Sequence, residues 1–472
     1  TSHHNENSDI WRLPLSGLMP ALNNEGFADE KCNPRMATYL CVLLLNNLDA
    51  PQNKVNQYRL GLQYLGLKHE ESARTIFNLI LEEGSGDKTV QGLSEIELLQ
   101  DEGETALQKL EKIAADYAGI PAVEARVLLE MGNRSLNMEA PDKALQFFQK
   151  VIREYSKERD ISAQAAFSQS RIYALVGNRE KLVESFIQVV RDYPDVAYWK
   201  QQSIEEILKL YENQPTLEKK VSSLQVLAET EIPVLSATVQ NRIGELYHQS
   251  AENLLAKEAY QKTLAKKAED EVFKARFALA RIYAEEENFD KSLSIYRGMS
   301  EGLNESYVQS ARAGQIQKLL EKGNWELRIG EVKLARKTFL QLIEFSPQTV
   351  KAHRGYLQAS AVLGENRVPF YRDRLKSEKN LAVDHYALGL ALTYLNPPAL
   401  DEAVVEIGKA LEQNSQEVFY HQTLGWIYEQ KERAESGFLE KALHEYQIAL
   451  SLNDDTDSRN EADLLLNLGN GH

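Results

Sequence analysis

One spacing recurs along this chain and constrains what it can fold into. A small residue is followed twelve positions later by another small residue, and sixteen positions later by a bulky aromatic or aliphatic one. Gly132, Ala144 and Phe148 form one such copy. Self-similarity with a period of about 20 to 50 residues is typical of folds in which one small unit is stacked many times. The spacing therefore predicts a repeat architecture.

Eight copies of the unit can be recognised, and each is anchored in its first half. The anchors are Gly61, Gly132, Gly244, Ala280, Gly323, Gly389 and Gly425, and Ser170 takes the place of the small residue in the unit that contains Tyr173. Weaker copies fill the gaps at 93–117, 198–230 and 350–375. Two antiparallel helices approach closely only where glycine or alanine faces the partner, and tyrosine or phenylalanine then fills the adjoining space. We therefore expect about eleven or twelve helix pairs, stacked so that neighbours bury one another.

The order of residues within the unit resembles the tetratricopeptide repeat (TPR) family, in which L-G-x-x-Y is followed by A, F, A and P at set distances. Gly425, Tyr428 and Ala442 follow this order, whereas the final proline is present only at Pro194 and Pro347. The resemblance implies an all-α fold, namely a right-handed TPR α-solenoid. Such a fold is a superhelix of antiparallel helix pairs with an inner groove.

The first residues do not fit the helical unit, because they are polar and then alternate between apolar and polar positions. Ser2 precedes the triplet DIW at 9–11, and serine and glycine follow at 16–17. This order resembles the end of a blade in TolB-like (PD40) β-propellers. The resemblance implies that the chain begins inside a propeller blade, and an N-terminal arm of unrelated origin remains the alternative.

Three regions follow from these patterns. We expect a non-repeat N-terminal arm at 1–20, a capping or first helical segment at 21–53, and the TPR array at 54–472. Leu468-Gly469 begins another unit whose second helix is missing, so the last unit is expected to be truncated. The chain is therefore expected to be part of a larger multidomain protein.

Composition and charge restrict the classes of partner. The chain has 54 basic and 70 acidic residues, a net charge of −16, which repels phosphate backbones and anionic lipid surfaces. The longest apolar stretch, at 37–45, is about half of the ~18 residues that a membrane span needs. We therefore expect neither nucleic-acid binding nor membrane insertion.

The two cysteines do not decide the compartment. Cys41 lies in an apolar helical run and is expected in the core, and a Cys32–Cys41 disulfide is the alternative. Localisation stays open between a bacterial cytoplasm and a periplasm.

A phosphate-binding loop and zinc-ligand pairs are not found in the sequence. The segment 84–89 has Asp87 where a phosphate-binding loop needs glycine, so it is interpreted as a turn. The motifs H-E-x-x-H and C-x-x-C do not occur, so ligand-spaced pairs for zinc are lacking. We therefore predict no catalytic residues, no metal site and no cofactor, and the chain is not expected to be an enzyme.

The predicted site is the inner groove, where first-helix positions that do not pack inward can contact a partner. Counting from each anchor places Arg171 and Arg281 at equivalent positions. The same counting places five further residues on that face: Asn133, Asn241, Lys274, Gln422 and Trp426. The arginines are expected to engage carboxylates of an extended peptide, or alternatively to pair with nearby glutamates of this chain.

The resulting prediction is a non-catalytic protein–protein interaction scaffold that binds a protein or peptide in the groove, or its own neighbouring propeller or effector domain. Two alternatives stay open. One is a regulatory or sensory region of a bacterial signalling protein, with propeller plus TPR array, whose effector domain is absent. The other is an enzyme whose active site lies in the missing parts.

Overall fold

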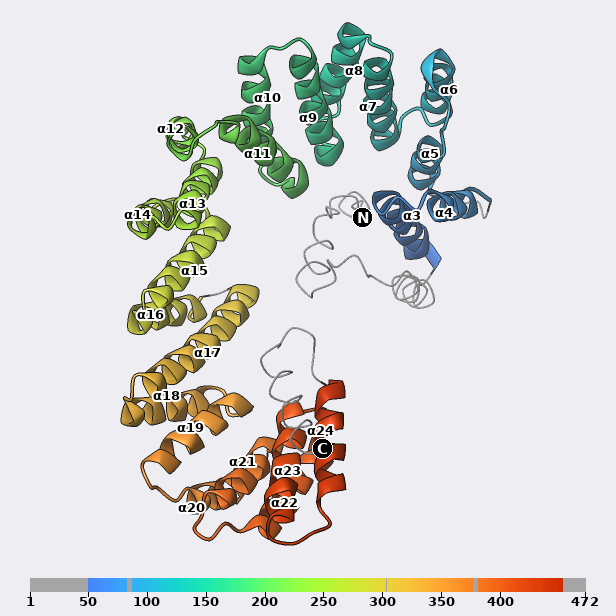
Figure 1. The fold of residues 1–472 in the computed structure, drawn as a ribbon. Helices are drawn as coiled ribbons and strands as arrows, with labels where there is room; N and C mark the ends of the chain where they lie inside the picture. The colour runs from blue at the N-terminus through green and yellow to red at the C-terminus, as the bar shows by residue number, and fades with distance from the viewer. Residues whose placement is uncertain (1–49, 83–86, 303, 377–380, 453–472) are drawn as a thin grey trace, which may run out of the picture. The chain divides into compact units, whose positions relative to one another are not determined.

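The computed structural model describes residues 50–82, 87–302, 304–376 and 381–452 (Figure 1). The arm at 1–20, most of the segment at 21–53 and both cysteines lie outside the described residues. So does the beginning of a further unit at Leu468-Gly469. The number of units and the propeller resemblance therefore stay predictions.

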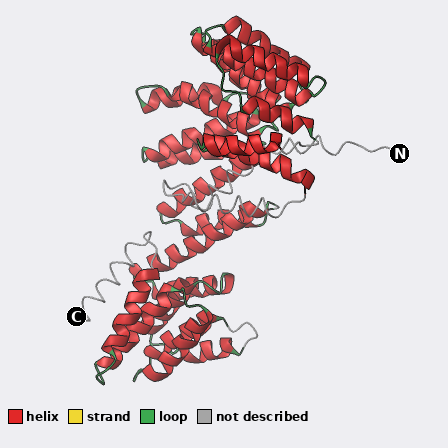
Figure 2. Ribbon diagram, turned by 90° about the vertical axis from the view of Figure 1, so that its right-hand side faces the viewer, coloured by secondary structure: helices red, strands yellow, loops and turns green. Residues whose placement is uncertain are grey.

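The described residues form helices and no strand (Figure 2). They divide into two compact units, Thr1–Val239 and Gln240–His472, and the boundary falls within helix α13. The first unit holds α3 (Ala50–Gly66), α4 (Glu70–Glu82), α5 (Lys88–Glu97), α6 (Gly103–Asp116), α7 (Pro121–Asn137), α8 (Pro141–Glu154), α9 (Arg159–Leu175), α10 (Arg179–Asp192), α11 (Ala197–Glu212) and α12 (Leu217–Ala228).

Helix α13 (Pro233–Gln249) begins in the first unit and ends in the second. The second unit continues with α14 (Asn253–Leu264), α15 (Glu269–Glu285), α16 (Phe289–Ser300), α17 (Glu305–Arg328), α18 (Val332–Phe345), α19 (Val350–Val362), α20 (Val368–Leu375), α21 (Ala382–Thr393), α22 (Leu400–Gln413), α23 (Val418–Glu432) and α24 (Leu439–Leu452). Odd-numbered helices are the first helices of successive pairs, and even-numbered helices are the second ones. The weaker sequence copies at 93–117, 198–230 and 350–375 fall on pairs of the same kind.

The predicted spacing is the contact between the helices of a pair. A methyl group added at Gly132 of α7 would lie 2.4 Å from the ring of Phe148 in α8. At Gly244 of α13 the corresponding distance to Tyr260 of α14 is 2.8 Å. The small residue is therefore a notch that accepts the ring sixteen positions later, and the all-α TPR-type solenoid predicted from the sequence is confirmed.

The ring of one pair also fills a notch in the next pair. Phe339 of α18 is fully buried, and added methyl groups at Gly323 of α17 and Gly355 of α19 would lie 2.7 and 2.4 Å from its ring. The ring is therefore packed between the first helix of its own pair and the first helix of the following one. This contact links successive pairs into one core.

Turns between helices use local capping. Gly177 ends α9 at φ 70°, a left-handed conformation that glycine adopts without strain, and Asn178 caps α10 by accepting from the Lys181 amide (3.0 Å). Asp87, in the segment interpreted as a turn, caps α5 by accepting from the Thr89 amide (2.9 Å).

First helices form the inner layer within each unit. Consecutive first helices contact one another, as α5 does with α7, α7 with α9, α17 with α19 and α19 with α21. No two consecutive second helices in the described ranges contact each other to a comparable extent. The side of the first helices that faces away from the second ones is therefore the surface that the fold offers to a ligand.

Candidate functional site

The candidate site is this outward side of the first helices, which we call the first-helix face. It is formed by the residues six and three positions before each notch and one position after it. These places correspond to Arg126 and Asn133 around the notch Gly132, and to Phe419, Gln422 and Trp426 around the notch Gly425. Packing with the second helix does not dictate these residues, so they are the positions left for binding.

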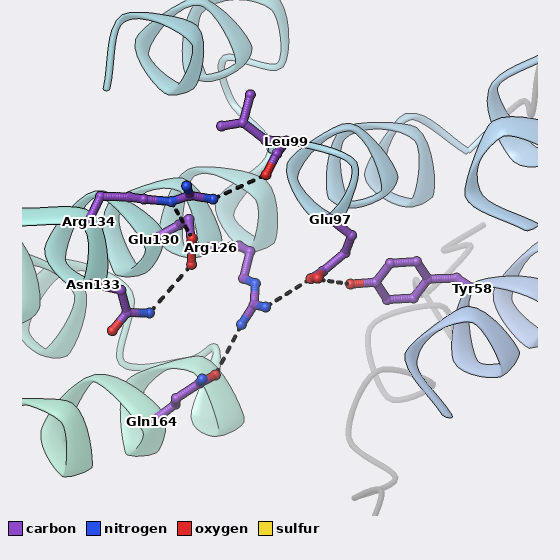
Figure 3. A network of polar contacts seen from close by, with 8 residues as sticks. All are labelled: Tyr58, Glu97, Leu99, Arg126, Glu130, Asn133, Arg134 and Gln164. Carbon is purple, nitrogen blue, oxygen red and sulfur yellow. Dashed lines mark hydrogen bonds and ion pairs between the residues drawn. The ribbon is translucent and has the colours of Figure 1, made fainter. Parts of the chain in front are cut away.

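Arg126 is the centre of a polar network in the first unit (Figure 3). Its Nη2 pairs with Glu97 Oε1 of α5 (2.8 Å), and its Nη1 donates to Gln164 Oε1 of α9 (3.1 Å). Tyr58 of α3 donates from its hydroxyl to Glu97 (3.4 Å). The exposed fractions of the Arg126 and Glu97 side chains are 22% and 10%. The network joins four first helices and neutralises the guanidinium.

Burial raises the pKa of two groups in and beside this network, Tyr58 and Asp160, and neighbouring charges modify both shifts. Burial raises the pKa of the Tyr58 hydroxyl, and the Glu97 carboxylate raises it further. Burial also raises the pKa of Asp160, which the charge of Arg126 partly offsets. Tyr58 therefore stays a neutral donor to Glu97 at ordinary pH.

Asn133 lies at the edge of the same network. Its Nδ2 donates to Glu130 Oε2 (3.4 Å), and Glu130 Oε1 pairs with Arg134 Nε (2.9 Å). Arg134 also donates from Nη2 to the backbone carbonyl of Leu99 (3.1 Å), which ties α7 to the end of α5. Asn133 is therefore part of a bonded arrangement, as Figure 3 shows.

Arg171 of α9 is exposed, and its side chain has no hydrogen bond or ion pair to a described residue. One turn before it, Phe167 contacts Phe186 and Trp199, with ring centroids 5.3 and 5.1 Å apart. Of the two outcomes expected for this arginine, an internal salt bridge is not found among the described residues. Arg171 therefore presents a cation beside an aromatic cluster.

Asn241 and Lys274 are brought together at the start of the second unit. Asn241 is buried, and its Nδ2 donates to the Glu271 carbonyl (2.9 Å) and to Glu271 Oε2 (2.8 Å). The exposed Lys274 pairs with Glu271 Oε1 (2.7 Å). Glu271 thus joins α13 to α15, and Asn241 acts in helix packing.

Arg281 lies two turns after Lys274 on α15. Its Nε is 3.6 Å from Glu285 Oε1, and the two side chains are 55% and 46% exposed. An ion pair this exposed contributes at most about 1 kcal/mol, so the guanidinium remains available to a ligand.

A second arginine-centred arrangement lies near the end of the second unit. Arg354 of α19 donates from Nη1 to Gln422 Oε1 of α23 (3.3 Å), and its guanidinium lies 4.4 Å from the centroid of the Phe419 ring. Lys351 Nζ lies 5.6 Å from the same ring centroid. Arg354 has no carboxylate partner among the described residues. This cation is therefore held by a ring and an amide and keeps its charge unbalanced.

Helix α21, between α19 and α23, is enclosed. Every residue at 383–392 is buried. Burial raises the pKa of the Tyr394 hydroxyl just beyond this helix, and the positive charge of Arg354 opposes that shift. Tyr394 is 47% exposed and Trp426 is 37% exposed. One accessible aromatic side chain, Tyr394, therefore lies near the guanidinium, and a second, Trp426, lies one turn beyond its partner Gln422.

Sequence reasoning missed Arg126 and Arg354, although a signal for the second was present. His353, His385 and His421 occupy corresponding places in α19, α21 and α23. The ring of His353 contacts the Pro347 carbonyl (2.8 Å), and that of His421 contacts the Ser415 carbonyl (3.0 Å). Aligning these histidines places Arg354 in register with Gln422.

Two chemical roles find no candidate among the residues that the structure describes. No group of three or more His, Cys, Asp or Glu side chains is placed to hold a metal ion. No described helix has both the length and the apolar character required to cross a bilayer. The arrangement on the first-helix face can donate hydrogen bonds to anions and contact apolar groups.

Comparison with known proteins found similarity in solved structures only. The sequence matches no protein-family model and no curated protein. The chain is similar to a chain of the APC/C hetero-tetramer Cut9-Hcn1, with 12% identity, a TM-score of 0.25 and coverage of 98% of this chain and 97% of that one. It is similar to YrrB, described as a TPR protein with an unusual peptide-binding site, with 15% identity, a TM-score of 0.24 and coverage of 53% and 99%. It is also similar to MamA from Desulfovibrio magneticus RS-1, with 16% identity, a TM-score of 0.23 and coverage of 39% and 97%.

Proposed function

We propose that this chain is a non-catalytic scaffold whose first-helix face binds an extended segment of a protein partner. The observation that carries the proposal is Arg171, an exposed cation without a partner among the described residues, on a face that helix packing does not require. Arg281 occupies the equivalent place on α15 and is held only by an exposed ion pair. In a chain of net charge −16, such cations favour carboxylates of a partner.

The test is affinity capture with two charge-matched variants of the full chain. Arg171→Glu combined with Arg281→Glu reverses both charges on the first-helix face. Arg153→Glu combined with Arg297→Glu reverses two exposed arginines on the second helices α8 and α16. Both variants are expected to melt within a few degrees of the wild type, because exposed substitutions usually change stability by less than about 0.5 kcal/mol.

Quantitative mass spectrometry of the captured proteins then gives the result. We expect the recovery of the main partner to fall at least tenfold for the first-helix variant and to stay unchanged for the second-helix variant. Equal recovery with both variants would contradict binding through Arg171 and Arg281.

A further inference from the structure

Among the cations of the first-helix face, Arg354 has the contacts from which the chemistry of a ligand can be inferred in most detail. Its guanidinium is oriented by the Phe419 ring at 4.4 Å and by one hydrogen bond to Gln422 at 3.3 Å. Its Nε and Nη2 atoms have no hydrogen-bond partner among the described residues, and the side chain is only half-buried. These two atoms form the edge of the guanidinium that binds a carboxylate with two parallel hydrogen bonds.

The charge around Arg354 also favours an anion. Lys351 lies on the same ring of Phe419, so two cations share one aromatic face. Tyr386, Tyr394, Phe419 and Gln422 lie around Arg354 from α21 and α23, and a carboxylate close to them, Glu417, accepts a hydrogen bond from the Phe419 amide (3.4 Å) and does not pair with Arg354. An arginine without an ion pair to a described carboxylate attracts a single carboxylate, whereas a polyanion is repelled by a chain of net charge −16.

An exposed apolar side chain, Trp426, lies one helical turn beyond Gln422, the residue that holds the Arg354 guanidinium. Trp426 follows Gln422 by four residues on the same face of α23, which is about 6 Å along the helix. In an extended peptide, side chains two residues apart lie on one face and about 6.6 Å apart. The step from Gln422, which holds the guanidinium, to Trp426 is therefore close to the step between positions i and i+2 of an extended chain.

We propose that Arg354, Gln422 and Trp426 form a docking site for an internal segment of a partner protein that carries Asp or Glu two residues from a bulky apolar residue. The acidic side chain bonds to Nε and Nη2 of Arg354, and the apolar side chain packs on Trp426. This inference rests on the proposed function and specifies the partner sequence for one part of the first-helix face.

Selection of binding peptides tests the site directly. The full chain is used as bait for a display library of random dodecapeptides flanked by linkers at both ends. The enriched sequences are then synthesised with acetyl and amide caps and measured by fluorescence anisotropy. We expect enriched peptides to contain Asp or Glu two positions from Trp, Phe or Leu.

Matched variants then assign the contacts. Arg354→Gln should weaken binding at least tenfold, Arg354→Lys should weaken it less, and Trp426→Ala should weaken it without abolishing selectivity for the acid. Arg372→Gln, at a second-helix arginine that is 53% exposed, should have no effect. A peptide with Glu replaced by Gln should bind wild type and Arg354→Gln equally, because the two changes remove the same interaction. Circular dichroism melts establish that the variants fold.

Three results would overturn this site. The enriched peptides bind Arg354→Gln as tightly as wild type, they require a free C-terminal carboxylate, or no sequence is enriched above a bait-free control. If the peptides instead depend on Arg171 or Arg281, the Arg354 site is wrong and the proposed function stands. If the captured partner and the peptides are insensitive to all three arginines, both proposals are wrong.

Discussion

Arg126 in the first unit and Arg354 in the second both lie on the first-helix face and both join first helices, yet their surroundings differ in charge. Arg126 bonds to the Glu97 carboxylate at 2.8 Å, whereas Arg354 contacts a ring and an amide. A guanidinium paired with a carboxylate is neutralised and serves the fold. A guanidinium without one retains its attraction for an anion from outside, so the comparison separates a structural arginine from a binding one.

The largest effect is expected when the Glu97 carboxylate, which Arg126 has and Arg354 lacks, is removed. Glu97→Gln leaves Arg126 without its carboxylate, and we expect a destabilisation of about 3 kcal/mol, the lower end for a buried pair that loses one partner. Arg354→Met removes a cation that no described carboxylate balances, so the loss should be about 1 kcal/mol or less. Hydrogen exchange of peptides covering α5 and α7, and of peptides covering α19 and α23, measures the two effects locally. Equal effects would show that both arginines have the same role.

Substitution of a notch glycine should lower stability to a similar extent in both units, because the two units share this packing contact. Gly132→Val and Gly244→Val each introduce a side chain against a ring, at methyl distances of 2.4 and 2.8 Å. We expect each to destabilise its helix pair by about 1 to 3 kcal/mol through overpacking. Urea denaturation followed by hydrogen exchange of α7 and α13 measures this. An unchanged midpoint for either variant would mean that its glycine is not a packing notch.

The smallest expected effect is the change of the unfolding free energy with pH, which should come from histidines of the second unit. The ring of His421 contacts two acceptors, Glu445 Oε2 at 2.6 Å and the Ser415 carbonyl at 3.0 Å. The Glu445 carboxylate raises the pKa of His421 against the effect of burial, so folding favours the imidazolium. Its contribution is complete below the unfolded value of about 6.5 and is lost as pH rises through the folded pKa.

His353 should act in the opposite direction. Burial lowers the pKa of His353 to about 4, and its ring is held by the Tyr371 hydroxyl at 3.0 Å and the Pro347 carbonyl. The contribution of His353 to the free energy of unfolding is complete above pH about 6.5 and is lost as pH falls toward 4.

Thermal melts from pH 5 to 8.5 measure the effect of His421. Relative to the wild type, His421→Asn should lose at most about 1 kcal/mol of unfolding free energy, and this loss should shrink as pH rises. His444→Asn, at an exposed position of α24, is the control. A deficit that grows with pH would contradict an imidazolium at position 421.

The fold was predictable from sequence because its main contact lies within one unit. Gly132 and Phe148 are sixteen positions apart, and the same offset recurs at Gly244 and Tyr260. Short-range spacing of this kind is visible in a single sequence. The site was less predictable, because counting identifies a face but not the partner that a neighbouring helix supplies.

Particular residues show this limit. Asn241 was expected on the groove, yet Glu271, thirty positions later, holds it in a buried bond. Gln422 is engaged by Arg354 from sixty-eight positions earlier, across the enclosed helix α21. Such pairs depend on the distance between successive first helices, and this distance cannot be inferred from the spacing of residues within one repeat. As partner contacts, all seven residues of the predicted site stay predictions.

The ring of Phe339, buried between Gly323 and Gly355, has a consequence for recombining this chain. A chimera that receives only α17 and α18 contains the Phe339 ring and Gly323. The residue that replaces Gly355 against the other side of the ring then comes from the next helix of the recipient protein. Any side chain there larger than hydrogen would collide with the ring, as the 2.4 Å methyl distance at Gly355 indicates. The transferable module is therefore a helix pair together with the first half of its successor, and chimeras should be joined after Gly355.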